Sequence, residues 1–518
     1  MALETQTHRR MVWAMLIGAA FLLRLASLHF LPGNLDGDSI GYLILGRNLL
    51  IKHVYSIRDA PPFDPTFTRV PGYPLFIALV YFVKLDSLNA IRIAQAVIDT
   101  LTCAGVAALA WWWEFDAGRK RAAAIAAFVL AAVCPFTLRY VPAILAETLS
   151  TFFAVAMALA ASRALMARKR RRVLAWWAAT GIAGALGTLV RPDGGLFFPA
   201  VIATLVFAVL FRISNFKFRV SSLESENNAL LCIAIAVLAF ICVLAPWPIR
   251  NAVVFNRFIP LQPRHQGLPD GFVPNGYYNW LQTWIDDQRY VKPLRWELDF
   301  SQISLDQIPP KAFDSPEERA RVAELLDRYN HPQSSSSEEQ SGITPSGNVT
   351  ARVKMTPEID SGFAQIARER RQRDPLRFYF RLPIKRAAAL WFDTHSDHYP
   401  FAGELFPIPD KSHFHDGVHS YAGYATLWIF ALLVWIYTLL GAAGAWRLWQ
   451  AESGDARIWV LLVAMMILPR LILFSTLDNP EPRFLVQFFP FLSVLGGIAI
   501  ARVFSGSRGR EEALASST

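Results

Sequence analysis

The chain has 518 residues, of which 53% are hydrophobic, and it carries a net charge of +10. A mean hydropathy of +0.30 excludes an ordinary soluble enzyme. The apolar residues come in blocks of about 15–25, long enough to cross a hydrocarbon core of roughly 30 Å as helices. Basic residues flank these blocks, as topology signals do, so we expect no binding to nucleic acid. We predict an all-α polytopic membrane protein.

The basic clusters decide which apolar segments cross the membrane, because Lys and Arg gather on the cytoplasmic side. The strongest cluster is RKRRR at 168–172, and it would lie outside if all of about eleven apolar segments crossed. PGYPLFIALVYFVK (71–84) is the shortest segment and has two prolines near its start, so we predict that it is re-entrant or interfacial. Both termini are then cytoplasmic. About ten spans remain, near 11–31, 89–113, 122–141, 144–165, 173–190, 194–212, 229–247, 421–446, 458–476 and 484–503.

These spans divide the chain into three parts. They are an N-terminal transmembrane module at 1–247 with its first outer loop at 32–88, a long outer loop at 248–420, and C-terminal helices with a cytoplasmic tail at 421–518.

The long outer loop has two predicted helices. SPEERARVAELLDRYN starts with Ser315 as a cap and Pro316 at the first helical position, and a second polar helix is predicted from Pro357 to about Arg373. Residues 332–347 are of low complexity. The loop therefore does not read as one compact domain.

Two acids open the first outer loop, in the stretch LDGDSIGY. Asp36 and Asp38 suit the start of a helix near Ser39, because acids there interact well with the helix dipole. The same pair could serve as a general base or bind a divalent cation, although a DxD pattern is short and weak alone. Glu147 raises a similar choice, because it lies in the first turn of an apolar segment and could simply begin the helix.

Four arginines lie at the outer ends of spans, on the same predicted face as Asp38. They are Arg69, Arg191, Arg250 and Arg483. Each alone is explained as a residue that anchors its span at the interface. Together they run against the positive-inside bias, and guanidinium groups bind phosphate bidentately. No Walker A loop or GxGxxG motif is present. Acids and arginines at the lipid boundary predict chemistry on a lipid-linked phosphate.

The chain resembles the membrane glycosyltransferases of the GT-C class, in particular bacterial members similar to protein O-mannosyltransferases and to aminoarabinose transferases that act on lipid A. The resemblance is carried by DSIGY (38–42), RVPGYPLFIA (69–78), LAETL at Glu147, GALGTLVRPDG (184–194), LAPWPIRNAVVFNRFIP (244–260) and RFLVQFFPFLSVLGG (483–497). It implies a GT-C fold, a polyprenyl-phosphate sugar donor, and an inverting transfer on the periplasmic face of a bacterial inner membrane.

The resemblance also implies roles for the site residues. The family pattern places a reactive Asp four residues before a Tyr, which here are Asp38 and Tyr42. Relatives often have Glu after that Asp, where this chain has Ser39, so the resemblance does not carry a second acid to that position, and Asp36 is a candidate to replace it. Asp38 is then the general base, and Glu147 orients the acceptor or an arginine.

The lipid phosphate would be bound by arginines, with Arg191 and Arg250 favoured over Arg69 and Arg483, and with Tyr42 beside them. Because arginines supply positive charge to the leaving phosphate, no cofactor is expected. A divalent metal at Asp36 and Asp38 stays open.

Two other classes of protein remain as alternatives. An O-antigen ligase or polymerase has a comparable number of spans and a large periplasmic loop, but relies on loop arginine and histidine. A flippase or transporter of a lipid-linked sugar usually shows repeated halves and mid-span charges, which we do not find. The sequence names neither the sugar nor the acceptor, which could be a protein, lipid A, a polysaccharide or another glycolipid.

Overall fold

The computed structural model describes residues 2–31, 33, 35, 37–213, 226–263, 272–332, 353–397, 399, 401, 421–451 and 456–515. Every regular element within these ranges is a helix, and none is a strand. The predicted all-α class is confirmed.

Eight helical segments are long and apolar enough to cross a membrane in the described part of the chain. They lie in α1 (Ala2–Phe30), α4 (Leu88–Trp113), α7 (Glu147–Met166), α8 (Arg170–Val190), η1 with α9 (Pro192–Leu196 and Phe197–Ile213), α16 (Tyr421–Trp449), α17 (Arg457–Ser475), and η8 with α18 (Pro482–Phe488 and Phe489–Ala515). Helices α10 (Glu226–Leu244) and α11 (Pro246–Phe255) are bent by 41° and give a ninth span if counted as one. The protein is therefore a multi-pass membrane protein.

The span predicted at 122–141 differs from the structure. Helix α5 (Lys120–Ala132) has only 13 residues, which is about 20 Å at 1.5 Å per residue. It stops before Pro135, which begins the short helix α6 (Pro135–Leu138), and an irregular segment leads to α7. Residues 140–146 of this segment are all buried. Irregular backbone is tolerated at membrane depth where protein covers it.

An arginine in α1 stabilises the early end of α5. Arg24 is fully buried, and its Nη1 donates to the carbonyl of Ala132 at 2.7 Å. Its Nε donates to Asp99 Oδ2 of α4 at 2.9 Å. The last carbonyls of a helix have no partner within the helix. Arg24 thus supplies a partner where water is excluded.

The first outer loop folds against one end of the bundle. It contains α2 (Gly37–Lys52) and α3 (Gly72–Val83), and α3 is a 12-residue apolar helix, too short to span, as predicted for an interfacial or re-entrant segment. A Cβ on Gly72 would lie 2.6 Å from the backbone of Leu189. Glycine therefore lets the start of α3 contact the end of α8 directly.

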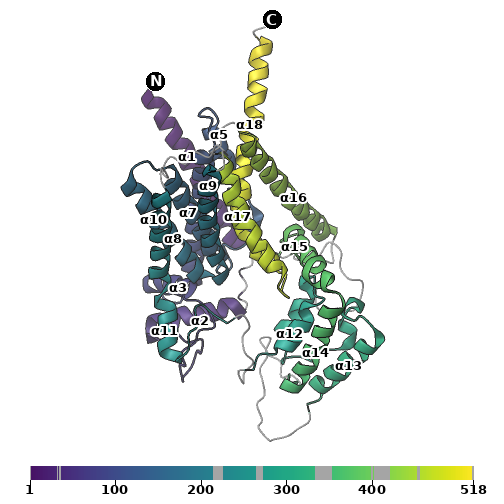
Figure 1. The fold of residues 1–518 in the computed structure, drawn as a ribbon. Coiled ribbons are helices and arrows are strands. Elements are labelled where there is room, and N and C mark those ends of the chain that lie inside the picture. The colour runs from purple at the N-terminus through teal and green to yellow at the C-terminus, as the bar shows by residue number, and fades with distance from the viewer. Residues whose placement is uncertain are drawn as a thin grey trace.

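The long outer loop has a hydrophobic core of its own. Helices α12 (Asn275–Gln282), α13 (Pro316–Asn330) and α14 (Pro357–Arg373) pack around Tyr277, Trp280 and Phe363. In Figure 1 they form a group beside the lower end of the bundle, and α15 (Leu382–Phe392) lies between this group and the bundle. The described residues of this loop thus contain a compact unit that the sequence did not make obvious. Most of the low-complexity stretch lies outside them.

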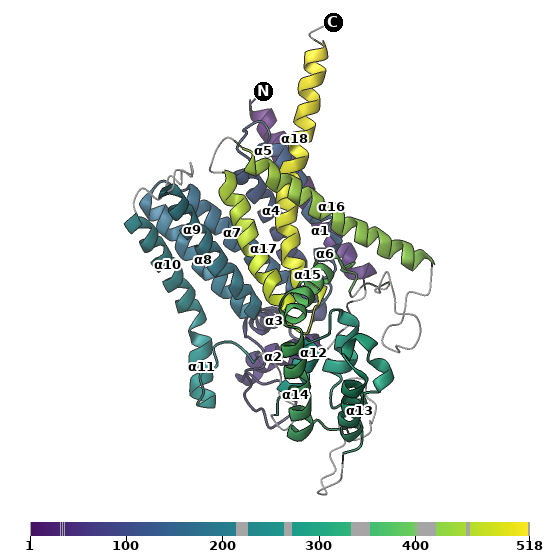
Figure 2. The same ribbon diagram turned by 45° about the vertical axis from the view of Figure 1, so that its right-hand side comes forward.

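Both ends of the chain lie at the opposite end of the bundle from this group. Figures 1 and 2 show the N- and C-terminal ends at the top, with α2, α3 and α12–α14 at the bottom. The arrangement agrees with the predicted placement of both termini on one side of the membrane.

Candidate active site

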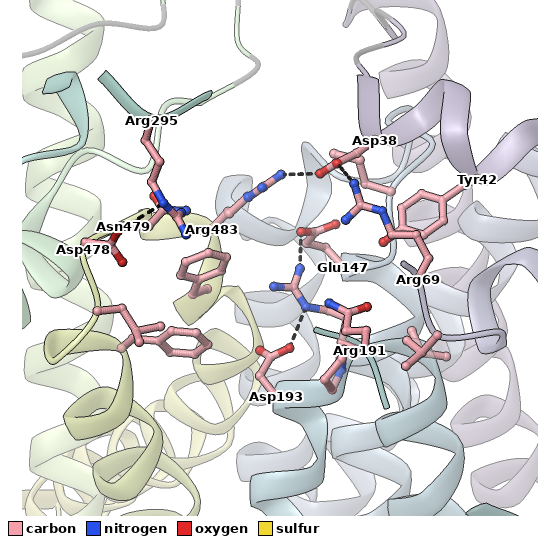
Figure 3. A pocket seen from close by; sticks show the side chains of 18 residues that line it. Asp38, Tyr42, Arg69, Glu147, Arg191, Asp193, Arg295, Asp478, Asn479 and Arg483 are labelled. Atoms are coloured by element: carbon pink, nitrogen blue, oxygen red, sulfur yellow. Dashed lines mark hydrogen bonds and ion pairs between the residues drawn. The ribbon is translucent and has the colours of Figure 1, made fainter. Parts of the chain in front are cut away.

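A cavity of about 300 Å³ lies where the bundle, the first outer loop and the long outer loop meet. Figure 3 shows its charged side chains, with Asp38, Tyr42 and Arg69 on one side and Arg295, Asp478 and Asn479 on the other. Four carboxylates (Asp38, Glu147, Asp193 and Asp478) and four guanidinium groups (Arg69, Arg191, Arg295 and Arg483) line it. The lining charges therefore cancel.

Asp38 lies in the first turn of α2 and contacts two arginines from distant parts of the chain. Arg69 Nη2 donates to its Oδ1, and Arg483 Nη1 lies 3.4 Å from its Oδ2. Burial alone would raise the pKa of Asp38, but the charges of Arg69 and Arg483 outweigh burial and hold the pKa below its ordinary value. Asp38 is thus a carboxylate at neutral pH, with its negative charge already compensated.

Tyr42 follows Asp38 by one helical turn and borders the same cavity. The Arg69 guanidinium lies 5.5 Å from the centre of its ring, within the range of a cation–π contact. Burial raises the pKa of Tyr42 to about 12. The Tyr42 hydroxyl therefore stays protonated and uncharged at neutral pH. The contact between Tyr42 and Arg69 is made by the aromatic ring.

Arg191 joins the ends of two spans through carboxylates. Its Nη1 donates to Glu147 Oε1 at the start of α7, and its Nε donates to Asp193 Oδ1 at 3.2 Å. Asp193 also accepts from Arg470 of α17, whose Nη2 donates in addition to Gln487 at 3.0 Å. This chain of contacts fixes Arg191 in the floor of the cavity.

The guanidinium groups of Arg191 and Arg483 stack against one aromatic ring. They lie 5.6 Å and 5.7 Å from the centre of Phe484. Arg483 Nε also contacts the carboxylate of Glu481. Two positive groups are thus held near one another on the side of the cavity that carries Asp38.

The opposite wall comes from the long outer loop and from the loop between α17 and η8. Arg295 Nε lies 3.1 Å from Asp478 Oδ2. Asn479 Nδ2 donates to Glu481 Oε1 at 2.5 Å. These residues were not predicted from sequence, although two acids in the short loop LDNPEPRF hint at them.

The structure brings together six predicted site residues, namely Asp38, Tyr42, Arg69, Glu147, Arg191 and Arg483. It does not bring Arg250 to them. Arg250 Nη1 donates to the carbonyl of Thr66 at 2.7 Å, and its guanidinium lies 5.2–5.6 Å from three aromatic rings. Asp36 lies outside the described residues.

Arg470 was also missed. It follows Pro469 inside an apolar span and is fully buried. A charge within a span is costly and usually marks a functional site. The sequence therefore contained a signal from which Arg470 could have been predicted. Among the described residues, no group of three or more His, Cys, Asp or Glu is arranged to hold a metal ion.

Residues 65–247 match the family model for dolichyl-phosphate-mannose-protein mannosyltransferases. The predicted resemblance is confirmed. The matched range includes Arg69, Glu147 and Arg191, whereas Asp38 and Arg483 lie on either side of it. The comparison with curated proteins found no match.

Among solved structures, the chain is similar to ArnT from Cupriavidus metallidurans. The form bound to undecaprenyl phosphate is 14% identical, with 96% of this chain and 79% of that chain covered and a TM-score of 0.38. The apo form is 15% identical over the same shares, with a TM-score of 0.36. At these low TM-scores the likeness does not extend to the positions of individual residues.

Proposed function

We propose that the protein is a glycosyltransferase that moves a sugar from a polyprenyl-phosphate donor to an acceptor hydroxyl, on the periplasmic face of a bacterial inner membrane. The observation that carries the proposal is the carboxylate of Asp38 held by Arg69 and Arg483 in a cavity at one end of the bundle. The match to a family of dolichyl-phosphate-mannose-dependent transferases supports the donor class.

The balance of charge in the cavity shapes how a phosphate would bind. Because Arg69 and Arg483 already contact Asp38, a donor phosphate competes with that carboxylate for the same guanidinium groups. Guanidinium binds phosphate and carboxylate with the same forked geometry. When the phosphate binds, Asp38 loses its compensating charges and becomes a stronger base. Donor binding thus activates the residue that the reaction needs.

The transfer then needs one base and a stabilised leaving group. Asp38 accepts the proton of the acceptor hydroxyl as its oxygen bonds to the anomeric carbon. The bond between that carbon and the phosphate oxygen breaks, and the polyprenyl phosphate leaves with the electron pair. Negative charge grows on the departing oxygen, where Arg69 and Arg483 stabilise it more than they stabilise the ground state.

Arg191 is a third donor to the phosphate, and Glu147 is its positioning residue. The Glu147 side chain is 2% exposed and contacts Arg191 at the start of α7. Asp193 fixes the Nε side of the same guanidinium. This geometry supports orientation of an arginine as the role of Glu147.

The placement of basic residues supports the outer face. Helix α7 begins at the cavity with Glu147 and has 20 residues, so it runs about 30 Å away from the cavity. The cluster RKRRR follows its far end, and α8 returns to the cavity at Arg191. By the positive-inside rule the cluster is cytoplasmic and the cavity faces outward.

The lipid tail of the donor has an apolar surface next to the site. On α3, the side chains of Leu79, Phe82 and Val83 are 70–85% exposed, and the helix follows Arg69 by a short connection. An exposed apolar helix beside a phosphate site suits a polyprenyl chain that enters from the membrane.

The test is donor turnover by the full chain in lipid, with labelled polyprenyl-phosphate sugars and a crude envelope extract as acceptor. Asp38→Asn should lower transfer about 10²–10⁴-fold, the range of general-base catalysis, with an unchanged unfolding temperature. Persistence of transfer in Asp38→Asn, together with its loss in Arg295→Ala, would favour the ligase-like alternative, because Arg295 is the long-loop arginine in the cavity. Movement of the donor between leaflets without its consumption would favour a flippase.

A further inference from the structure

The two walls of the cavity differ in what they offer a ligand. The side near Asp38 presents guanidinium donors, which suit the oxygens of a phosphate. The side near Asn479 presents oxygen acceptors. Asn479 Oδ1 is buried, and no described residue donates a hydrogen bond to it. Asp478, 2% exposed, lies beside it on the same lining.

The orientation of the Asn479 amide follows from its partner. Its amide nitrogen lies 2.5 Å from a carboxylate oxygen of Glu481, and an ionised carboxylate only accepts hydrogen bonds. The NH₂ group must therefore face Glu481, and Oδ1 must face away from it. Asp478 uses Oδ2 on Arg295 in the ion pair at 3.1 Å.

A second buried acceptor belongs to Glu147, which also lines the cavity. Glu147 Oε1 contacts Arg191, while Glu147 Oε2 is buried and accepts no hydrogen bond from the described residues. Buried acceptors without a donor are costly and uncommon. Two of them on one cavity indicate a ligand that brings hydrogen-bond donors, which the phosphodiester group and the lipid of a polyprenyl-phosphate sugar do not have.

We infer that Asn479 and Asp478 form the specificity subsite for the transferred sugar, whose hydroxyl or amino groups donate to them. The inference rests on the proposed function. A cavity of about 300 Å³ is at the small end of ligand sites. It has room for one sugar ring with its phosphate.

The subsite fits the sugar better than the acceptor because of its link to Arg483. Asn479 and Arg483 both contact Glu481. A group bonded to a phosphate on Arg483 therefore lies next to Asn479. The acceptor hydroxyl must instead approach Asp38, and Figure 3 shows Arg483 between Asp38 and the wall of Asp478 and Asn479.

The test compares two ligands on the same protein in lipid nanodiscs. The ligands are plain polyprenyl phosphate and a panel of polyprenyl-phosphate sugars with a hexose, a pentose, an amino sugar or a disaccharide. The wild-type chain should bind one class of monosaccharide donor at least about tenfold more tightly than plain polyprenyl phosphate.

Asn479→Leu removes the acceptor at similar volume and should abolish the preference while leaving the affinity for plain polyprenyl phosphate unchanged. Asp478→Asn should weaken it, and serves if Asn479→Leu does not fold. Asn89→Leu, at an exposed position at the start of α4, is the matched control and should behave as wild type.

The outcomes separate the two proposals. If the wild-type chain does not bind polyprenyl phosphate, the proposed function fails. If it binds polyprenyl phosphate but prefers no monosaccharide donor, or if folded Asn479→Leu keeps the full preference, the proposed function stands and the sugar subsite is refuted.

Discussion

Two buried arginines in this protein make similar ion pairs for different purposes. Arg24 lies within the bundle and Arg191 lines the cavity, and each contacts a carboxylate on a neighbouring span. The donors of Arg24 are fully used by Asp99, by the sulfur of Cys103 and by backbone carbonyls. Around Arg191, by contrast, one oxygen of Glu147 has no hydrogen-bond donor.

This difference in how completely the polar atoms are satisfied distinguishes a structural ion pair from one at a functional site. A buried charge is costly, and the cost is offset when every polar atom around it is satisfied. A saturated pair such as Arg24 with Asp99 therefore holds helices together. An incompletely satisfied pair on a cavity leaves a place for a ligand. The comparison predicts that equal substitutions at the two arginines have opposite consequences.

The sharpest test replaces each arginine with lysine. Lysine keeps the charge but lacks the fork that lets Arg191 contact Glu147 and Asp193 together. Arg191→Lys should lower transfer by about 10²–10³-fold, the loss seen when one preorganised donor is removed, with little change in unfolding temperature. Initial rates and thermal unfolding of the purified protein measure both.

Arg24→Lys is the matched variant and should show the reverse. It leaves the Ala132 carbonyl or Asp99 without its donor, which costs about 1–3 kcal/mol of stability. The unfolding temperature should fall, while kcat per folded molecule stays at the wild-type value. An equal loss of kcat in both variants would contradict the distinction.

Gly72→Ala tests whether the cavity depends on close packing as the bundle does. The added methyl would lie 2.6 Å from the backbone of Leu189, so α3 must move away from α8. Arg69 and Arg191 precede α3 and follow α8, and their separation should change. Because small misplacements cost catalysis heavily, we expect a loss of transfer of about tenfold or more. Gly18→Ala in α1, where a Cβ meets no atom within 4 Å, is the control for a helix-borne alanine.

The pH dependence tests the proposed activation of Asp38. In the free enzyme Arg69 and Arg483 keep its pKa below the ordinary value, so protonation occurs only in strong acid and kcat/KM should show no acid limb from Asp38 between about pH 5 and 8. In the donor complex the phosphate takes the arginines, and the pKa rises. The acid limb of kcat should therefore lie at higher pH than that of kcat/KM. Coincident limbs would mean that the donor leaves the arginines on Asp38.

Sequence reasoning succeeded where the signal was local. Ser315 caps α13 with a hydrogen bond of 3.2 Å to the Glu318 amide, and α14 covers Pro357–Arg373 as predicted. Asp38, Arg69 and Arg483 could be grouped because each is a charge at a span edge, and the membrane confines such residues to one plane.

The rest depended on contacts that no local pattern encodes. Asp193 pairs with Arg470, which is 277 positions further along the chain. The Ala132 carbonyl at the end of α5 accepts a hydrogen bond from Arg24 of another helix. The long outer loop gains its core from segments on both sides of the low-complexity stretch. A position at the end of a span predicts the face of the membrane on which a residue lies, but not whether its side chain lines the cavity. Arg250 shows this limit, because it contacts three aromatic rings outside the cavity.

Arg250 is the third kind of arginine in the comparison and gives the smallest expected effect. Rings of Tyr55, Trp247 and Phe255 surround its guanidinium, and it does not line the cavity. Arg250→Ala should therefore lower stability by about 0.5–2 kcal/mol through lost cation–π contacts. Donor KM and kcat should stay within about threefold of wild type, as for a substitution away from the site.

The same variant decides between the phosphate-binding role predicted for Arg250 from the sequence and the position outside the cavity that Arg250 has in the structure. The sequence places Arg250 among the two arginines most favoured to bind the phosphate, whereas the structure places it in an aromatic cage. A rise in donor KM of tenfold or more, without loss of folding, would put the phosphate near α11 instead of in the cavity. In that case the ion pairs of Arg69 and Arg483 with Asp38 would be structural, like the pair of Arg24 with Asp99. An incompletely satisfied pair on a cavity would then no longer indicate a ligand site.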